Sequence, residues 1–116
     1  MRKHFSRKEL ECPCCGECHM DDGFLDHLEM ARIIAGVPFP INSGYRCPKH
    51  NKEVGSSSRN HVDGKAVDIC CLNSYNRARI LAGLFQAGFR RIGIHGRYIH
   101  ADTMDLPEAV WLYQGG

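Results

Sequence analysis

The order in which helical and strand patterns follow one another constrains the possible folds of this chain more than any other feature. Apolar residues recur at near-helical spacing over residues 21–36, and Gly36 and Pro38 mark the end of that helix. A capping-box pair predicts a short helix over residues 7–11, and a further short helix is predicted over residues 48–54. The first half of the chain is therefore predicted to be mainly helical.

The rest of the chain consists of short apolar segments and one helical pattern. Four segments have the length and composition of short strands: residues 40–46, 65–71, 89–95 and 98–103. Residues 73–88 have the spacing of an amphipathic helix. Helices followed by strands with one intervening helix predict an α+β fold, with a small, mainly antiparallel sheet and helices packed on one face.

The size of the chain limits it to one hydrophobic core. It has 116 residues, of which 43% are hydrophobic, so one core can form but not two. We therefore expect a single domain over residues 1–116, on which a cysteine-rich N-terminal segment, residues 1–20, is packed. We also expect a monomer.

Charge and hydropathy exclude several kinds of partner. The 15 Lys and Arg residues are mixed with 13 Asp and Glu residues, so the chain has no basic block for nucleic acid. Its apolar runs are shorter than a bilayer crossing, so membrane insertion is not expected. The segment after Met1 is polar rather than apolar, so we expect synthesis in the cytoplasm without a signal peptide.

Seven cysteines are many for a chain of this length, and four lie in the sequence E-C-P-C-C-G-E-C-H. An odd number in a chain without an export signal argues against a closed disulfide framework. This cluster could present several thiolates to a second, structural metal held by Cys12, Cys15, Cys18 and Cys47, with His50 as an alternative fourth ligand. Its two C-x-x-C spacings share Cys15, so they are not the separate pairs of a typical zinc site. The other interpretations are reduced thiols near the surface, or a redox or metal-sensing element.

Three residues in the second half are hard to explain by folding alone. Asp68 lies in an apolar predicted strand, where an unpaired carboxylate would be costly to bury. A bound cation would offset that cost, and His61 and His100 provide two imidazoles that could complete the site. Two imidazoles and one carboxylate leave a fourth zinc position open for water, as a catalytic zinc site requires.

The motifs around these residues resemble a known family. They are S-G-Y-R-C-P-K-H-N at 43–51, H-V-D-G-K-A-V-D at 61–68 and I-H-A-D at 99–102. Together they resemble the zinc D-Ala-D-Ala carboxypeptidases and L-alanyl-D-glutamate endopeptidases, which include phage endolysin domains and share a fold with the hedgehog signalling domain. The resemblance implies Zn²⁺ held by His61, Asp68 and His100. It also implies cleavage of peptide bonds in peptidoglycan stem peptides or cross-links, at the bacterial cell wall or in the periplasm after release.

The resemblance also implies roles for residues around the metal. Arg46 matches the arginine that binds a substrate carboxylate, a role that suits a bidentate guanidinium. His95 corresponds to a histidine that steadies the scissile carbonyl or the oxyanion in several members. Asp102 is predicted to accept the second imidazole proton of a zinc-bound histidine, or to bind a backbone amide.

One family position departs from the common pattern. Many active members carry an acidic general base three residues before the last zinc histidine, where this chain has Arg97. A guanidinium cannot accept a proton near neutral pH. The candidates that remain for the base are Asp63, Asp102 and His95. The alternative function is therefore a non-catalytic, zinc-containing module that binds the cell wall or assists its assembly.

Overall fold

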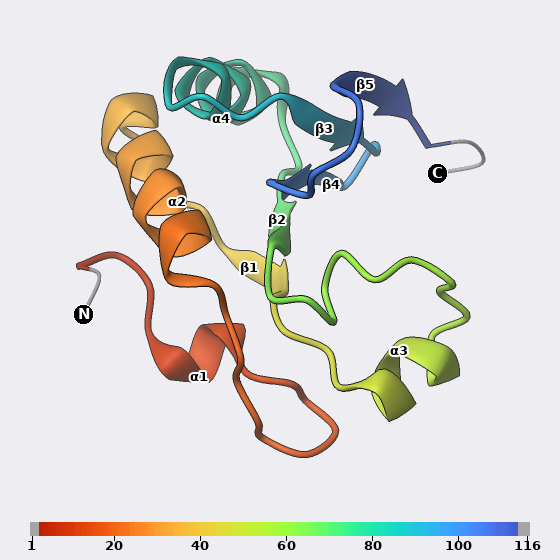
Figure 1. Cartoon of the computed structure of the whole chain (residues 1–116). Helices are drawn as coiled ribbons and strands as arrows, with labels where there is room; N and C mark the ends of the chain where they lie inside the picture. Colours follow the sequence, from red (N-terminus) through yellow and green to blue (C-terminus); the bar gives the residue numbers. More distant parts are fainter. Residues whose placement is uncertain (1–2, 114–116) are drawn as a thin grey trace.

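The computed structural model describes residues 3–113, so the two ends of the predicted domain, residues 1–2 and 114–116, lie outside the described residues. The elements in chain order are α1 (Arg7–Leu10), α2 (Asp22–Ala35), β1 (Ile41–Ser43), α3 (Pro48–Glu53), β2 (Ala66–Cys70), α4 (Ser74–Gln86), β3 (Arg91–Ile94), β4 (Tyr98–Asp102) and β5 (Ala109–Leu112) (Figure 1). The predicted α+β fold is confirmed.

The helices begin and end where the capping residues predict. The Asp21 carboxylate accepts a hydrogen bond from the backbone N–H of Phe24 at 2.8 Å and caps α2. Gly36 ends the same helix in the left-handed conformation, with φ 70°. At the start of α4, Asn73 accepts a hydrogen bond from the N–H of Asn76. Local chemistry therefore fixes both long helices.

The five strands form one sheet in the order β1-β2-β4-β3-β5. Every neighbouring pair is antiparallel except β3 and β5, which run parallel. The four predicted strand segments each contain an observed strand, whereas β5 was not predicted. The sheet is thus mainly antiparallel, with one parallel strand added at its edge.

Strand alternation gives the sheet two chemically different faces. Val67 and Ile69 of β2 and Ile99 of β4 are fully buried in the core formed with α2 and α4, which lie side by side (Figure 1). Because successive side chains point to opposite faces of a strand, Asp68 and His100 project from the other face. The apolar face packs in the core and stabilises the fold. The opposite face carries Asp68 and His100, two of the three predicted metal ligands.

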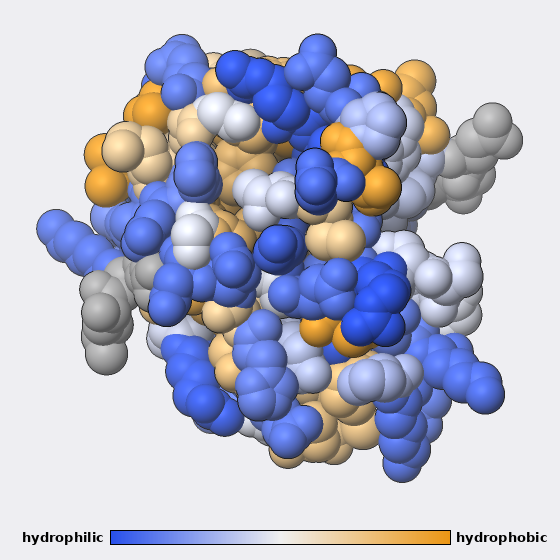
Figure 2. All heavy atoms as spheres, viewed as in Figure 1, coloured by the Kyte–Doolittle hydropathy of each residue, from blue (hydrophilic) through white to orange (hydrophobic). Residues whose placement is uncertain are grey.

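The exposed surface is mainly hydrophilic. Figure 2 shows that hydrophilic residues cover most of one face and that apolar residues form only small, scattered areas there. Within residues 3–113, none of the helices combines the length and hydrophobicity that a bilayer-spanning segment requires.

Candidate functional site

The three predicted metal ligands are brought together by a strand pair and a loop. Asp68 of β2 and His100 of β4 are direct partners in the antiparallel register. His61 comes from the loop that precedes β2. Asp68 Oδ1 lies 3.0 Å from His100 Nδ1 and 3.5 Å from His61 Nε2. Two imidazoles that lie 39 positions apart in the chain therefore converge on one carboxylate oxygen of Asp68.

Hydrogen bonds on the far side of each imidazole fix which nitrogen faces this oxygen. His61 Nδ1 lies 2.8 Å from the carbonyl oxygen of Gly44, which can only accept, so Nδ1 carries the proton. His100 Nε2 lies 2.6 Å from the Asp102 carboxylate and donates to it. In their neutral forms, His61 Nε2 and His100 Nδ1 therefore present lone pairs toward Asp68.

This arrangement brings three electron-pair donors together, and it requires a positive charge between them. Tetrahedral zinc with bonds of about 2.1 Å places its nitrogen and oxygen ligands about 3.4 Å apart. The separations of 3.0 and 3.5 Å lie on either side of that value, and all three ligand atoms lie within 4.8 Å of one another. The residues at this site therefore fit zinc in both number and donor type.

The pKa shifts of Asp68 and His100 in the metal-free protein also indicate that this site favours a positive charge. Burial raises the pKa of Asp68, but its interactions with His100 and His61 lower it more, so it remains a carboxylate far below neutral pH. Burial lowers the pKa of His100, but Asp102 and Asp68 raise it above its ordinary value. Without a metal, the two carboxylates therefore favour the protonated form of His100, whose charge partly replaces that of a divalent cation.

Asp102 supports the site from behind His100. Its side chain is fully buried, and one carboxylate oxygen accepts from Arg91 Nε at 2.8 Å and from the N–H of Met104 at 3.1 Å. The other oxygen binds His100 and, at 3.3 Å, the side-chain amide of Asn60. Burial raises the pKa of Asp102, but these partners lower it below its ordinary value. Asp102 is therefore held as an acceptor that orients His100.

Asp102→Asn should weaken zinc binding about 10- to 100-fold, because the amide cannot hold the His100 tautomer as the carboxylate does. Competition against a chromophoric chelator measures this affinity. The matched control is Asp105→Asn, which removes an exposed carboxylate three residues away and should leave affinity unchanged. Equal zinc affinity in the Asp102 variant and the natural protein would contradict the orienting role.

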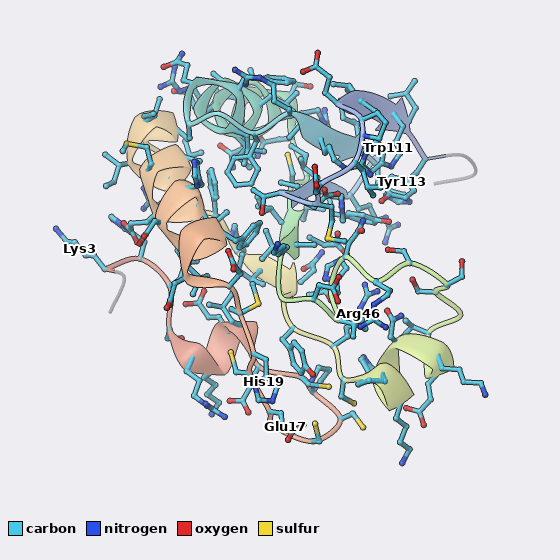
Figure 3. The ribbon with its side chains drawn as sticks, in the orientation of Figure 1. Lys3, Glu17, His19, Arg46, Trp111 and Tyr113 are labelled. Atoms are coloured by element: carbon cyan, nitrogen blue, oxygen red, sulfur yellow. The ribbon has the colours of Figure 1, made fainter. Side chains whose placement is uncertain are left out.

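A pocket of about 530 Å³ surrounds the three ligands. Arg46 lines it from the segment after β1, and Tyr98, Trp111 and Tyr113 line it from β4 and the C-terminal end (Figure 3). The aromatic residues of this wall were not predicted from the sequence. Trp111 lies in the unpredicted strand β5, and its ring centroid is 5.5 Å from that of His100. Strand β5 pairs in parallel with β3, and β4 lies between the two in the chain. The local sequence of β5 therefore gives no signal of its place beside the site.

Arg46 points into the pocket and is held by three side chains. Its Nη2 lies 3.4 Å from Asp68 Oδ2, Nε donates to Ser43 Oγ at 3.1 Å, and Nη1 donates to Asn51 Oδ1 at 3.3 Å. Its side chain is 15% exposed. A guanidinium has five N–H donors, so these contacts orient Arg46 without using all of its donors.

The structure places the candidates for the general base apart from the pocket lining. Asp63 is exposed and forms an ion pair with Arg59 at 3.1 Å. His95 stacks on Tyr98 with ring centroids 4.5 Å apart, and its Nδ1 accepts from the N–H of Arg97. With Asp102 fully engaged, Asp68 is the only acidic residue among the described residues that line the pocket.

The predicted cysteine ligands are grouped differently from the expectation. Cys12 and Cys47 lie together, but Cys14 completes their group of close sulfur atoms. Cys18 instead packs against the main hydrophobic core. The overlapping C-x-x-C spacings did not reveal this, because sequence spacing does not show which way adjacent thiols in a tight loop point.

Comparison with known proteins identifies the family. No curated protein matches the chain. A protein-family model described as Peptidase M15 matches residues 3–102, which include the three candidate ligands, Arg46 and Asp102. Members of that family are zinc-dependent peptidases, in agreement with the donor set found here. Because this match covers most of its length, the chain belongs to the Peptidase M15 family.

Proposed function

We propose that this protein is a zinc peptidase that cleaves peptide bonds in peptidoglycan stem peptides or cross-links. The observation that carries the proposal is the convergence of His61 Nε2, Asp68 Oδ1 and His100 Nδ1, with both imidazole tautomers fixed by outer acceptors. When bound, zinc would polarise the scissile carbonyl and lower the pKa of a water molecule toward neutrality.

The chain's own residues would bind and orient the substrate. Arg46 is charged, partly buried and fixed by three partners, so it is suited to bind a carboxylate of a stem peptide with two parallel hydrogen bonds. Trp111 and Tyr113 provide an apolar wall opposite Arg46 (Figure 3). A peptide with a free carboxylate and small apolar side chains matches these two surfaces in charge and hydropathy.

The proposal is tested by incubating the purified protein with D-Ala-terminated peptides and with peptides that contain the L-Ala–D-Glu bond. Mass spectrometry of the products identifies which bond is cut. We expect cleavage of one of these peptides, loss of cleavage with a chelator, and recovery when zinc is added. Absence of cleavage in the zinc-loaded protein would contradict the peptidase proposal.

A second candidate function is a zinc-containing module that binds cell-wall peptides without cutting them. It is favoured by one observation: apart from Asp68, no acidic residue lines the described part of the pocket. The same peptides distinguish the two functions, because the second predicts zinc-dependent binding in a calorimeter with no product.

Arg46→Lys should lower kcat/KM about 10- to 100-fold for a substrate that carries a free carboxylate. Lysine keeps the charge but loses the planar fork that makes two parallel hydrogen bonds. The effect should be much smaller for the same peptide with that carboxylate amidated. Zinc content, measured for each variant, separates a substrate effect from a change at the neighbouring ligand Asp68. An equal loss for the acid and the amide would contradict carboxylate recognition.

A further inference from the structure

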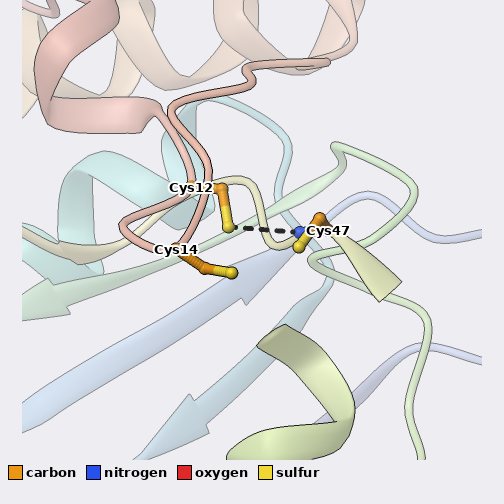
Figure 4. A group of neighbouring side chains, drawn as sticks. All are labelled: Cys12, Cys14 and Cys47. Atoms are coloured by element: carbon orange, nitrogen blue, oxygen red, sulfur yellow. Dashed lines mark hydrogen bonds between the residues drawn. The ribbon is translucent and has the colours of Figure 1, made fainter. Parts of the chain in front are cut away.

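A second group of possible metal ligands lies outside the histidine site. Cys12 and Cys14 come from the loop between α1 and α2, and Cys47 is the N-cap of α3 (Figure 4). Their sulfur atoms all lie within 4.8 Å of one another, and all three are free thiols. In a tetrahedral zinc–thiolate site with bonds of about 2.3 Å, sulfur atoms lie about 3.8 Å apart. Small side-chain rotations would therefore bring these thiols to one ion.

Backbone N–H groups donate to two of the three sulfur atoms and favour the thiolate form of Cys12. The N–H of Cys47 donates to Cys12 Sγ at 3.4 Å (Figure 4). The N–H of His50 donates to Cys47 Sγ, also at 3.4 Å. Burial raises the pKa of Cys12, but backbone N–H groups of Cys47, Cys14 and Cys15 lower it to about 7. Thiolates are the form that binds a soft metal.

Burial distinguishes the members of this group. Cys12 is fully buried and Cys47 is 8% exposed, and both pack with Tyr45 in a cluster separate from the main core. Cys14 and Cys15 are exposed, so the group opens to solvent on that side, beside a cavity of about 550 Å³. Cys15 does not belong to the group of close sulfur atoms, and its thiol donates to Glu17 Oε2 at 3.8 Å.

We propose that Cys12, Cys14 and Cys47 form a second metal site that binds zinc. The site would link the N-terminal segment to residues 44–47, which also contribute to the histidine site. Gly44 provides the carbonyl that orients His61, and Arg46 points into the pocket. The N–H of Tyr45 already donates to the carbonyl of Leu10 at 2.8 Å, so a metal would reinforce an existing contact. This inference does not depend on the peptidase activity.

The test uses the full chain with the histidine site removed by His61→Ala and His100→Ala. We expect this protein to retain one zinc per chain by elemental analysis, whereas the natural protein binds two. Titration with Co²⁺ should give the near-ultraviolet charge-transfer absorption of thiolate ligation. Cys14→Ser in the same background should weaken metal binding at least tenfold. Cys18→Ser is the matched control, and we expect it to bind metal as the parent does.

Several outcomes would overturn the proposal. They are loss of all metal from a folded protein that lacks the two histidines, equal metal affinity in the Cys14 and Cys18 variants, and a disulfide within the group in unreduced mass spectra. If the double histidine variant does not fold, the Co²⁺ spectrum of the otherwise natural chain provides the test. Cys14→Ser, an exposed and conservative change, must then reduce the thiolate absorption, and an unchanged spectrum would refute the site.

Discussion

Asp68→Asn should remove one zinc per chain and lower peptidase activity about 1,000-fold or more. The amide has nearly the shape of the carboxylate, but it lacks the charge that binds the metal together with His61 and His100. A catalytic metal supplies several kcal/mol of transition-state stabilisation, and each 1.36 kcal/mol corresponds to a factor of ten in rate. Elemental analysis and peptide hydrolysis with saturating substrate measure the two effects.

The control for this prediction is Asp63→Asn, which removes a carboxylate from the same loop region without touching the pocket. Asp63 is exposed, and its carboxylate forms an ion pair with Arg59. We expect its zinc content and activity to match those of the natural protein. An Asp68 variant that retained both zinc and activity would refute the assignment of the histidine site as the catalytic centre.

Gly64→Ala should lower the free energy of unfolding by about 3 kcal/mol or more. Gly64 has φ +71°, a conformation that costs a non-glycine residue about 1–3 kcal/mol. An added Cβ would also lie only 1.9 Å from the backbone oxygen of His19, so two backbone segments would have to separate. Because 1 kcal/mol shifts the Tm of a domain this size by about 4–8 °C, we expect Tm to fall by about 10–25 °C.

Gly55→Ala is the matched control for this clash. Gly55 also has a positive φ, +79°, but an added Cβ would meet nothing within 4 Å. Its variant should therefore show only the conformational cost, and the difference between the two variants measures the effect of the close approach. Thermal and urea unfolding give both values. Equal destabilisation by the two substitutions would contradict the role assigned to the contact at His19.

Gly64 also connects stability with the candidate site. Its carbonyl accepts from the N–H of Asp21, the N-cap of α2, and its N–H donates to the carbonyl of His61. The loop that carries His61 is therefore fixed to the start of the longest helix. A variant at this position that folds at low temperature should also bind zinc less tightly at the histidine site.

Local signals made most of the fold predictable. Capping residues fixed the ends of α2 and α4, and apolar segments identified β2, β3 and β4. Strand β5 was missed because its sequence, AVWL, is short and mainly exposed, and because its parallel partner β3 lies beyond an intervening strand. Gly93 leaves space against Trp111, where an added Cβ would lie 2.5 Å from the indole nitrogen. Such a contact between distant residues has no local pattern.

The candidate site was predictable only in part, for a similar reason. Asp68 stood out because an unpaired carboxylate is costly to bury, and His61 and His100 stood out because their motifs complete a metal site with it. The structure brings all three together. What orients them comes from elsewhere in the chain: the Gly44 carbonyl fixes His61, and Arg91 fixes Asp102. A backbone carbonyl carries no residue-type signal. The same limit explains why Cys14, rather than Cys18, lies beside Cys12.

The indole of Trp111 gives this protein an intrinsic optical reporter. Trp111 is the only tryptophan in the chain, and its ring contacts that of His100 while the Arg91 guanidinium lies 5.2 Å from its centroid. Its fluorescence emission therefore depends on the charge and occupancy of the histidine site, and a paramagnetic ion bound there would quench it. Loading of that site can thus be followed without a label and at low protein concentration.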